Sequence, residues 1–287
     1  MKLALGKHTL DLAARPHVMG ILNVTPDSFW DGGRYGDAGA ALARAGEMAA
    51  EGADIIDVGG ESTRPGSAPL EVAAEIDRIG PVVERIAAGL RVAISIDTRK
   101  AAVAREALGL GAHMINDISG LAFDPGMVEV ARESGAPVVV MHMRGTPETM
   151  QQLTDYDDVV GEVRRELAER VAFAEARGIR PDRILIDPGI GFAKTAIQNV
   201  ELLARLDELT KIGKPMVVGP SMKSFMGKTL GLEPGQRAEA TVACCVLAAA
   251  KGASIFRVHD VAGVARALAM TELILKTERS MSRSAEV

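Results

Sequence analysis

Short apolar runs alternate with longer amphipathic stretches along most of the chain. The runs are rich in Val, Ile and Met, which is typical of strands buried on both faces, and the stretches between them have the spacing of helices. Eight strands are predicted in this way, at His17–Leu22, Asp54–Val58, Val92–Ile96, His113–Ile115, Pro137–Met141, Arg183–Ile186, Pro215–Val218 and Ser254–Val258. Eight strand–helix units predict an α/β protein with a closed (β/α)8 TIM barrel, rather than an open doubly wound sheet.

The barrel is predicted to form a single domain. Gly52, Gly111 and Gly252 each fall where a helix is expected to end, just before the next strand. No linker rich in Gly, Ser or Pro divides the sequence. We therefore expect an N-terminal β-hairpin or cap over residues 1–16, the barrel over residues 17–277, and a flexible tail over residues 278–287.

Composition narrows the class of protein. Hydrophobic residues make up 47% of the chain and aromatic residues only 3%, so the core is expected to consist mainly of Ala, Val, Ile and Leu. The net charge of −5 argues against a nucleic-acid partner. A signal peptide and an apolar run long enough to cross a membrane are both missing from the sequence, so no membrane partner and a cytoplasmic location are expected. The adjacent Cys244 and Cys245 are expected to be buried free thiols.

The predicted strands end in polar residues. These are Asn23, Asp57, Asp97, Asn116, His142, Asp187, Ser221 with Lys223, and Arg257 with His259. A single Asp after a strand is usually a helix cap, but eight polar ends in succession make that explanation weak. The carboxyl ends of barrel strands converge on one face, where the active sites of this architecture lie.

Two kinds of ligand group suit these side chains. Asp and Asn can pair with the donor-rich edge of an aminopyrimidinone-like ring, and a buried carboxylate is costly unless it is paired. Arg64, Arg257 and His259 suit a phosphorylated or carboxylated group, and Lys223 could serve either end.

Seven segments, in order, resemble the motifs of the dihydropteroate synthases. They are residues 23–33 (NVTPDSFWDGG), 57–66 (DVGGESTRPG), 95–98 (SIDT), 115–120 (INDISG), 141–143 (MHM), 187–192 (DPGIGF) and 257–260 (RVHD). The resemblance covers about residues 17–277. One motif could mislead, but seven with barrel spacing are specific.

The resemblance implies a transferase that condenses 6-hydroxymethyl-7,8-dihydropterin pyrophosphate with p-aminobenzoate in folate biosynthesis, and that sulfonamides inhibit. It implies that Asp97, Lys223 and Arg257 are catalytic. The pterin would be held by Asp97, Asn116, Asp187 and Lys223, with Arg257 stacked on its face. The p-aminobenzoate site would consist of Thr63, Pro65, Phe192, Lys223 and Ser224.

The resemblance also implies an anion site, a cofactor and an assembly. Asn23, Arg64, Arg257 and His259 would lie near the pyrophosphate, and Asn23 would help to hold a Mg²⁺ ion on it. The family further implies a homodimer built from barrel helices on the side away from the active site.

Two positions depart from the family pattern. Met222 stands where Ser-Arg-Lys would place an arginine, which removes a fixed cation and puts turnover and sulfonamide affinity in question. Ala193 replaces a usual glycine, which is expected only to stiffen its loop.

Two other functions are weighed against the synthase. One is a methyltetrahydrofolate–corrinoid methyltransferase, which also uses a pterin-binding barrel but needs neither a pyrophosphate leaving group nor an arylamine site. The other is a pterin-binding paralogue that lost turnover when the arginine became Met222.

Overall fold

The computed structural model describes residues 1–24, 36–62 and 69–285. Its strands are β1 (Lys2–Leu5), β2 (His8–Asp11), β3 (His17–Asn23), β4 (Ile55–Gly59), β5 (Ala93–Asp97), β6 (Met114–Asp117), β7 (Val138–Met141), β8 (Ile184–Asp187), β9 (Val217–Val218) and β10 (Ile255–Val258). Its α-helices are α1 (Gly36–Ala50), α2 (Val72–Gly89), α3 (Ala101–Gly109), α4 (Met127–Ser134), α5 (Val159–Ala176), α6 (Ala196–Ala204), α7 (Ser224–Leu230), α8 (Ala238–Ala250) and α9 (Val261–Ala285). Short 3-10 helices lie at Met150–Gln152, Pro181–Arg183, Leu206–Ile212 and Pro234–Gln236.

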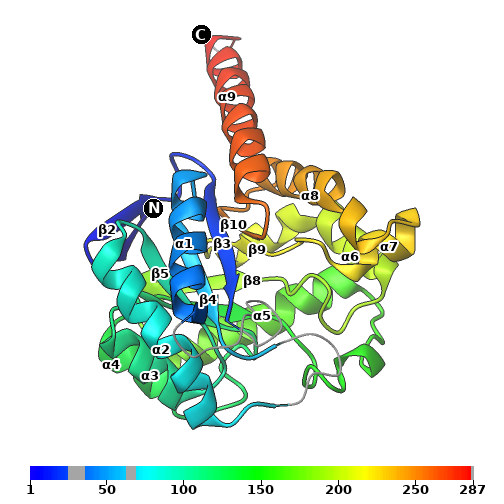
Figure 1. The fold of residues 1–287 in the computed structure, drawn as a ribbon. Helices are drawn as coiled ribbons and strands as arrows, with labels where there is room; N and C mark the ends of the chain where they lie inside the picture. Colours follow the sequence, from blue (N-terminus) through cyan, green and yellow to red (C-terminus); the bar gives the residue numbers. More distant parts are fainter. Residues whose placement is uncertain (25–35, 63–68, 286–287) are drawn as a thin grey trace.

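Strands β3 to β10 form one eight-stranded parallel sheet in the order β8-β7-β6-β5-β4-β3-β10-β9 (Figure 1). A parallel bridge between Ile186 and Met216 joins the two ends of this order, and Ile186 N donates to the carbonyl of Pro215 at 3.0 Å. The sheet therefore closes on itself, which confirms the predicted (β/α)8 barrel and its eight strands. Strand β9 is the shortest, with two residues instead of the four expected.

The alternation of side chains along each strand divides the core into two parts. Outward side chains such as Ile56, Ile94, Val140 and Phe256 pack with the surrounding helices. Inward side chains near the start of each strand form a separate apolar layer across the barrel, made of Met19, Ile55, Ala93, Met114, Val139, Leu185, Val217 and Ile255. Because side chains repeat every two residues in a strand, the next inward layer lies two residues further along each strand, toward the carboxyl ends.

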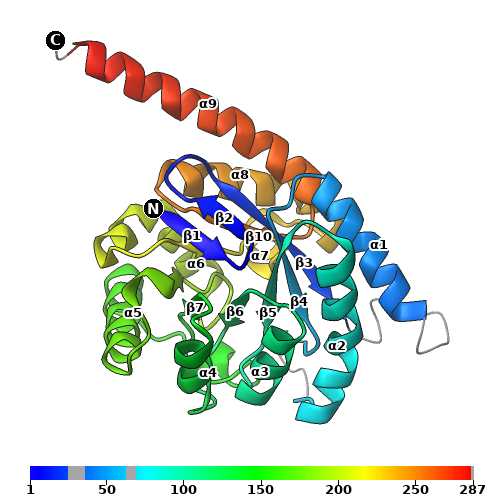
Figure 2. The ribbon, with the colours of Figure 1, turned by 90° about the vertical axis from the view of Figure 1, so that its left-hand side faces the viewer.

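The N-terminal strands β1 and β2 form an antiparallel hairpin with Leu5 opposite His8. Leu3, Leu5 and Leu10 belong to the inner apolar layer, so the hairpin covers the end of the barrel where the strands begin (Figure 2). Residues 1–16 thus contain a hairpin of the kind that the sequence predicted.

The C-terminal helix α9 runs away from the body of the barrel in both ribbon views (Figures 1 and 2). It continues to Ala285, whereas the sequence predicted a flexible tail from residue 278. The polar composition after Glu278 permits helix where it extends an established helix, and the flexibility of residues 278–287 remains a prediction.

Candidate active site

The inward layer after the apolar one is polar. Two residues beyond Ile55, Ala93, Met114, Leu185 and Ile255 stand Asp57, Ser95, Asn116, Asp187 and Arg257. Residues two positions apart in a strand point to the same side, so these side chains also point into the barrel. They form the next layer toward the carboxyl ends of the strands. Asp97 and Asn23 occupy the same inward phase at the ends of their strands.

Arg257 lies at the centre of this layer, between two carboxylates. Its Nε donates to Asp57 Oδ2 and its Nη2 donates to Asp97 Oδ2, each at 2.6 Å. Asn116 Nδ2 also donates to Asp57 Oδ2, at 3.1 Å. Strands β4, β5, β6 and β10 thus contribute to one hydrogen-bonded group, although Asp57 and Arg257 are 200 residues apart in sequence.

The group has more acceptors than it uses. Asp57 Oδ1, Asp97 Oδ1 and Ser95 Oγ are buried and have no hydrogen-bond partner among the described residues, and Asp57 is 0% exposed. Leaving a buried acceptor unpaired costs about 1–3 kcal/mol. Unpaired acceptors in one place therefore indicate where a donor-rich ligand binds.

Electrostatics agree with this interpretation. Burial raises the pKa of Asp97, and the neighbouring carboxylate of Asp57 raises it further, while Arg257 opposes both. Burial also raises the pKa of Asp187. Burial lowers the pKa of Arg257, but the carboxylates of Asp57 and Asp97 outweigh burial and raise this pKa above its ordinary value. The three carboxyl groups around Arg257 favour a ligand that brings hydrogen-bond donors or partial positive charge.

A second group of residues lies around Lys223, at the start of α7. Its Nζ donates to the carbonyl oxygen of Ile190 and lies 4.5 Å from the centre of the Phe192 ring. Burial lowers the pKa of Lys223 to about 8, although the charges of Asp187 and Asp97 act to raise it. The structure therefore brings Lys223 and Phe192 together, beside the carboxylates of the polar layer.

The remaining predicted residues lie around this centre. Ser221 Oγ and His259 Nδ1 are 2.9 Å apart, which links the loop after β9 to the end of β10. Asn23 ends β3 and pairs with Gly59 of β4, and Ser224 begins α7 with an exposed side chain. Thr63, Arg64 and Pro65 lie outside the described residues.

Met222 adopts a left-handed backbone conformation, with a φ of 56°. Its N–H donates to Thr241 Oγ1 at 3.0 Å, and its carbonyl oxygen accepts from Arg237 Nη1 at 3.2 Å. The side chain is half-buried, with its sulfur 4.0 Å from Thr241 Oγ1. The thioether thus contacts α8 and has a packing role.

Ala193 also has a positive φ, of 49°. The expectation that alanine only stiffens its loop was incomplete, because a left-handed conformation costs a residue with a Cβ about 1–2 kcal/mol. A glycine would avoid that cost.

Sequence reasoning noted Asp57 as a polar strand end but gave it no role. The signal was available, since Asp57 has the same inward phase as Asn116 and Arg257. Sequence reasoning also missed Lys194, which lies buried next to His142. Arg257 was expected to stack on the ligand, and that orientation remains a prediction.

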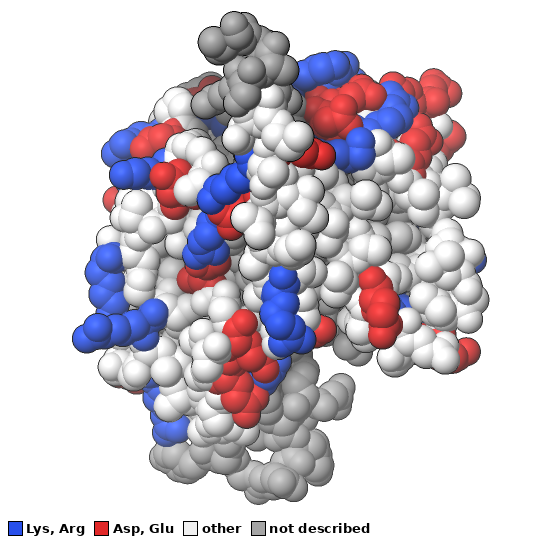
Figure 3. All heavy atoms as spheres, turned by 90° about the horizontal axis from the view of Figure 1, so that it is seen from above, with Lys and Arg blue, Asp and Glu red and all other residues white. Residues whose placement is uncertain are grey.

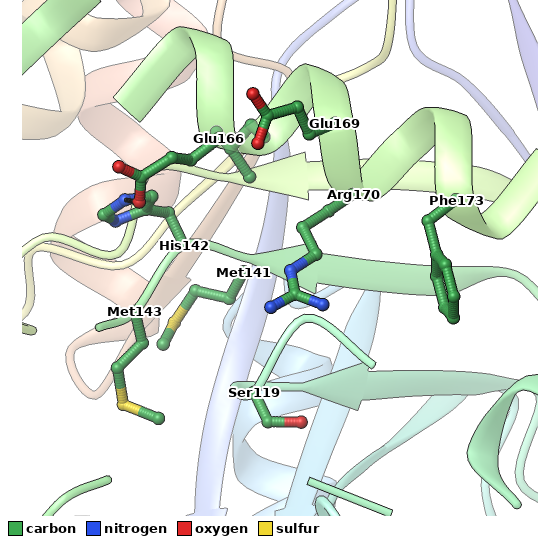
Figure 4. A pocket seen from close by; sticks show the side chains of 9 residues that line it. Ser119, Met141, His142, Met143, Glu166, Glu169, Arg170 and Phe173 are labelled. Carbon is green, nitrogen blue, oxygen red and sulfur yellow. Dashed lines mark hydrogen bonds and ion pairs between the residues drawn. The ribbon is translucent and has the colours of Figure 1, made fainter. Parts of the chain in front are cut away.

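A separate hollow lies away from this centre. It has a volume of about 260 Å³ and lies between α5 and the ends of β6 and β7, lined by Ser119, Met141, His142, Met143, Glu166, Leu167, Glu169, Arg170 and Phe173 (Figure 4). It contains none of the residues around Arg257. We place the active site at the polar layer because the unpaired buried acceptors are there.

Fold and site together define a class: a (β/α)8-barrel enzyme that binds a polar heterocycle at the carboxyl ends of its strands. Residues 19–259 match the family described as pterin binding enzymes. The dihydropteroate synthase of Escherichia coli is 48% identical, and the alignment covers 98% of this chain and 99% of that one.

Solved structures agree. The dihydropteroate synthase of Yersinia pestis, in a sulfonamide drug complex, is 46% identical with a TM-score of 0.90, covering 96% of this chain and 100% of that one. The Xanthomonas albilineans enzyme, in complex with 7,8-dihydropteroate, is 43% identical with a TM-score of 0.87, covering 96% and 99%. The chain belongs to the pterin binding enzymes and, within them, to the dihydropteroate synthases.

Proposed function

We propose that this protein condenses 6-hydroxymethyl-7,8-dihydropterin pyrophosphate with p-aminobenzoate, giving 7,8-dihydropteroate and pyrophosphate. The observation that carries the proposal is the buried group of Asp57, Asp97, Asn116 and Arg257, whose free carboxylate oxygens match the donor-rich edge of a pterin. Support comes from the X. albilineans relative, which holds 7,8-dihydropteroate.

The pterin ring is assigned to the polar layer. The amino and ring N–H groups of the pterin are bound by Asp97, Asn116 and Asp187. Asp57 positions Arg257 and Asn116 by accepting a hydrogen bond from each of them. Arg257 contacts the ring from the barrel centre, and Lys223 reaches it from the side of β8.

The p-aminobenzoate site is assigned to the rim beside Lys223. The ring of Phe192 and the start of α7 at Ser224 form one wall, and the resemblance to the family assigns Thr63 and Pro65 to the same substrate. Lys223 lies where the two substrates meet, with Asp187 on one side and Phe192 on the other.

Arg64, His259 and Arg257 are assigned to the pyrophosphate, together with a Mg²⁺ ion held by Asn23. The described residues include no cluster of three or more His, Cys, Asp or Glu side chains able to hold a metal. Mg²⁺ commonly uses only one or two protein ligands when substrate phosphates and water complete its shell, so the single amide oxygen of Asn23 fits this ion. When bound, Mg²⁺ neutralises charge on the leaving group.

The reaction needs alignment and charge stabilisation more than a strong base. As the C–O bond breaks, its electron pair leaves with pyrophosphate and positive charge develops on the pterin methylene, where Asp97 and Asp187 stabilise it. The amine of p-aminobenzoate is unprotonated at neutral pH and forms the new C–N bond, then releases a proton. Holding both substrates in line supplies much of the remaining acceleration.

One steady-state assay tests the proposal. The purified protein with pterin pyrophosphate, p-aminobenzoate and Mg²⁺ should release dihydropteroate and pyrophosphate in equal amounts, and EDTA should slow the reaction. Pterin binding without product would support the inactive paralogue instead. Methyl transfer from methyltetrahydrofolate to a corrinoid would support the methyltransferase, which the synthase names of the relatives already disfavour.

Replacing Met222 by arginine is expected to keep the protein folded and to change kcat/KM by no more than about tenfold, about 1.4 kcal/mol. The half-buried thioether packs near Thr241, while Lys223 and Arg257 retain the cationic side chains of the site. We expect kcat/KM of this variant to rise. A thousandfold rise would favour the paralogue, and a collapse of thermal stability would show that the packing of Met222 is indispensable.

We also propose a homodimer formed through α6, α7 and α8. Large apolar side chains are exposed on these neighbouring helices: Ile197 is 69% exposed, Leu230 64% and Leu247 61%. On the face seen in Figure 3, Lys and Arg side chains lie among Asp and Glu side chains rather than in one basic patch. None of the described helices combines the length and apolarity needed to span a membrane, and the cytoplasmic location remains a prediction.

Ile197→Asp combined with Leu247→Asp is expected to convert the dimer to a monomer of 30.2 kDa. A charge buried at an apolar contact without a partner is strongly unfavourable. Light scattering after size exclusion measures the mass, with Val72→Asp, at an exposed apolar position of α2, as the control. A wild-type monomer would refute the dimer, and an unchanged double variant would place the contact elsewhere.

A further inference from the structure

The loop between β8 and α6 is folded unusually tightly. Gly189, Gly191 and Ala193 all have positive φ, of 67°, 86° and 49°. A Cβ at Gly189 would lie 2.0 Å from the carbonyl oxygen of His142, so this position requires glycine. The loop presents the carbonyl of Ile190 and the ring of Phe192 to Lys223.

Lys194 lies beneath this loop and is 3% exposed. Its Nζ contacts three acceptors: the carbonyl oxygen of Gly189 at 3.2 Å, that of Phe192 at 3.0 Å, and His142 Nδ1 at 3.0 Å. An ammonium group has three N–H donors, and each of them has a partner here. The side chain therefore ties both ends of the segment 189–192 to the end of β7.

His142 is itself held in a defined state. Its Nε2 lies 3.0 Å from Glu166 Oε2 (Figure 4). Arg144 in turn pairs with Glu166. Since Nδ1 accepts from Lys194, Nε2 carries the proton and donates to Glu166. Burial lowers the pKa of His142 to about 4, and the charge of Lys194 lowers it further, so the ring is neutral at physiological pH.

Burial lowers the pKa of Lys194 to about 7, although the charge of Asp187 acts to raise it. The three acceptors favour the ammonium form, because a neutral amine would turn its lone pair toward one of them. Among the described residues, Lys194 makes no hydrogen bond to Arg257 or to its partners Asp57 and Asp97. The mechanism proposed above leaves this buried lysine without a role.

We propose that Lys194, oriented by His142, is a positioning residue for the p-aminobenzoate site: it fixes the 189–192 segment so that Phe192 and Lys223 hold the arylamine in line. The inference rests on the proposed function. The pterin side has separate support, because Asp57, Asp97 and Asn116 lie on β4, β5 and β6 and hydrogen-bond with Arg257 and with one another rather than with the 189–192 segment. Loss of Lys194 should therefore affect one substrate much more than the other.

Lys194→Met tests this through the two Michaelis constants. We expect KM for p-aminobenzoate to rise by at least about tenfold, since small displacements of a positioning group are costly, while KM for the pterin pyrophosphate changes by less than about threefold. The matched control is Lys214→Met. Lys214 is also largely buried, with partners in Glu175 (2.6 Å) and the carbonyl of Pro181 (2.9 Å), but it precedes β9 at the opposite end of the barrel.

A second pair of variants serves if Lys194→Met does not fold. His142→Asn keeps an acceptor near the position of Nδ1, whereas His142→Leu removes it. We expect His142→Leu to raise KM for p-aminobenzoate and His142→Asn to recover at least part of that loss.

The outcomes separate the two proposals. A wild-type protein that makes no dihydropteroate refutes the proposed function before any variant is compared. An active wild type whose variants leave KM for p-aminobenzoate unchanged, or raise both KM values equally, refutes the positioning role alone. Equal losses in His142→Asn and His142→Leu would also overturn it.

Discussion

Replacing Asp97 by asparagine is expected to lower kcat/KM by about 100- to 1000-fold, the scale at which a single preorganised electrostatic group contributes to catalysis. Asparagine has nearly the same shape, and its side-chain oxygen can still accept from Arg257 Nη2, which now lies 2.6 Å from Asp97 Oδ2. The variant therefore loses the negative charge that stabilises the developing cation while keeping its place in the barrel. Steady-state kinetics measure the loss, and circular dichroism verifies the fold.

Asp124→Asn is the matched control. The carboxylate of Asp124 accepts from Ala101 N at 2.8 Å and from Gly126 N at 2.9 Å, so its role is confined to loop and helix ends. We expect that variant to keep its activity. Asp97→Asn turnover within about threefold of wild type would mean that Asp97 lies outside the pterin pocket.

Replacing Lys100 by methionine is expected to destabilise the protein by about 3–5 kcal/mol, the usual cost of removing one partner from a buried ion pair. Lys100 Nζ donates to Glu61 Oε2 at 2.6 Å, to Glu75 Oε2 at 2.5 Å and to the carbonyl of Leu70 at 2.6 Å. Glu75 is 0% exposed, so the variant leaves its charge buried without a cation. Chemical denaturation measures the free energy of unfolding.

The double variant Lys100→Met with Glu75→Gln should recover part of this stability, because it removes the orphaned charge as well. If the single variant lost less than about 1 kcal/mol, solvent would have to reach Glu75 and the pair would behave as an exposed one. The exposed pair Arg165–Glu169 on α5 provides the comparison.

Much of the barrel was predictable because it depends on local patterns. All eight parallel strands were found within one or two residues, since a buried strand has its own signature of Val and Ile runs between helices. The convergence of polar strand ends such as Asn116 and Arg257 on one face followed from the barrel architecture. The predicted bounds of β9 were the least accurate. Its pairing with β8 rests on a single bridge at Met216, which the sequence does not reveal.

The rest of the site depends on contacts between distant segments. Lys194, His142 and Glu166 come from three separate loops or helices, and their sequence spacing has no period that would group them. Asp57 could be placed in the interior but not beside Arg257, because register across a closed sheet is set by the whole barrel. The sequence did not indicate that α9 would extend to Ala285, because helix propensity is a weak guide at a polar terminus.

The hairpin of β1 and β2 has a consequence for how the chain reaches its native state. Leu3, Leu5 and Leu10 pack in one layer with residues from every barrel strand, from Met19 to Ile255. Those contacts span almost the whole sequence, and contacts of such separation form late because they require the largest loss of chain entropy. Neighbouring strands can pair as each becomes available, but the hairpin has its full binding surface only after β10 has docked. A segment near the N-terminus thus lacks its full set of apolar partners until β10 docks, so we expect full protection of the Leu3 and Leu5 amides from hydrogen exchange only after barrel closure.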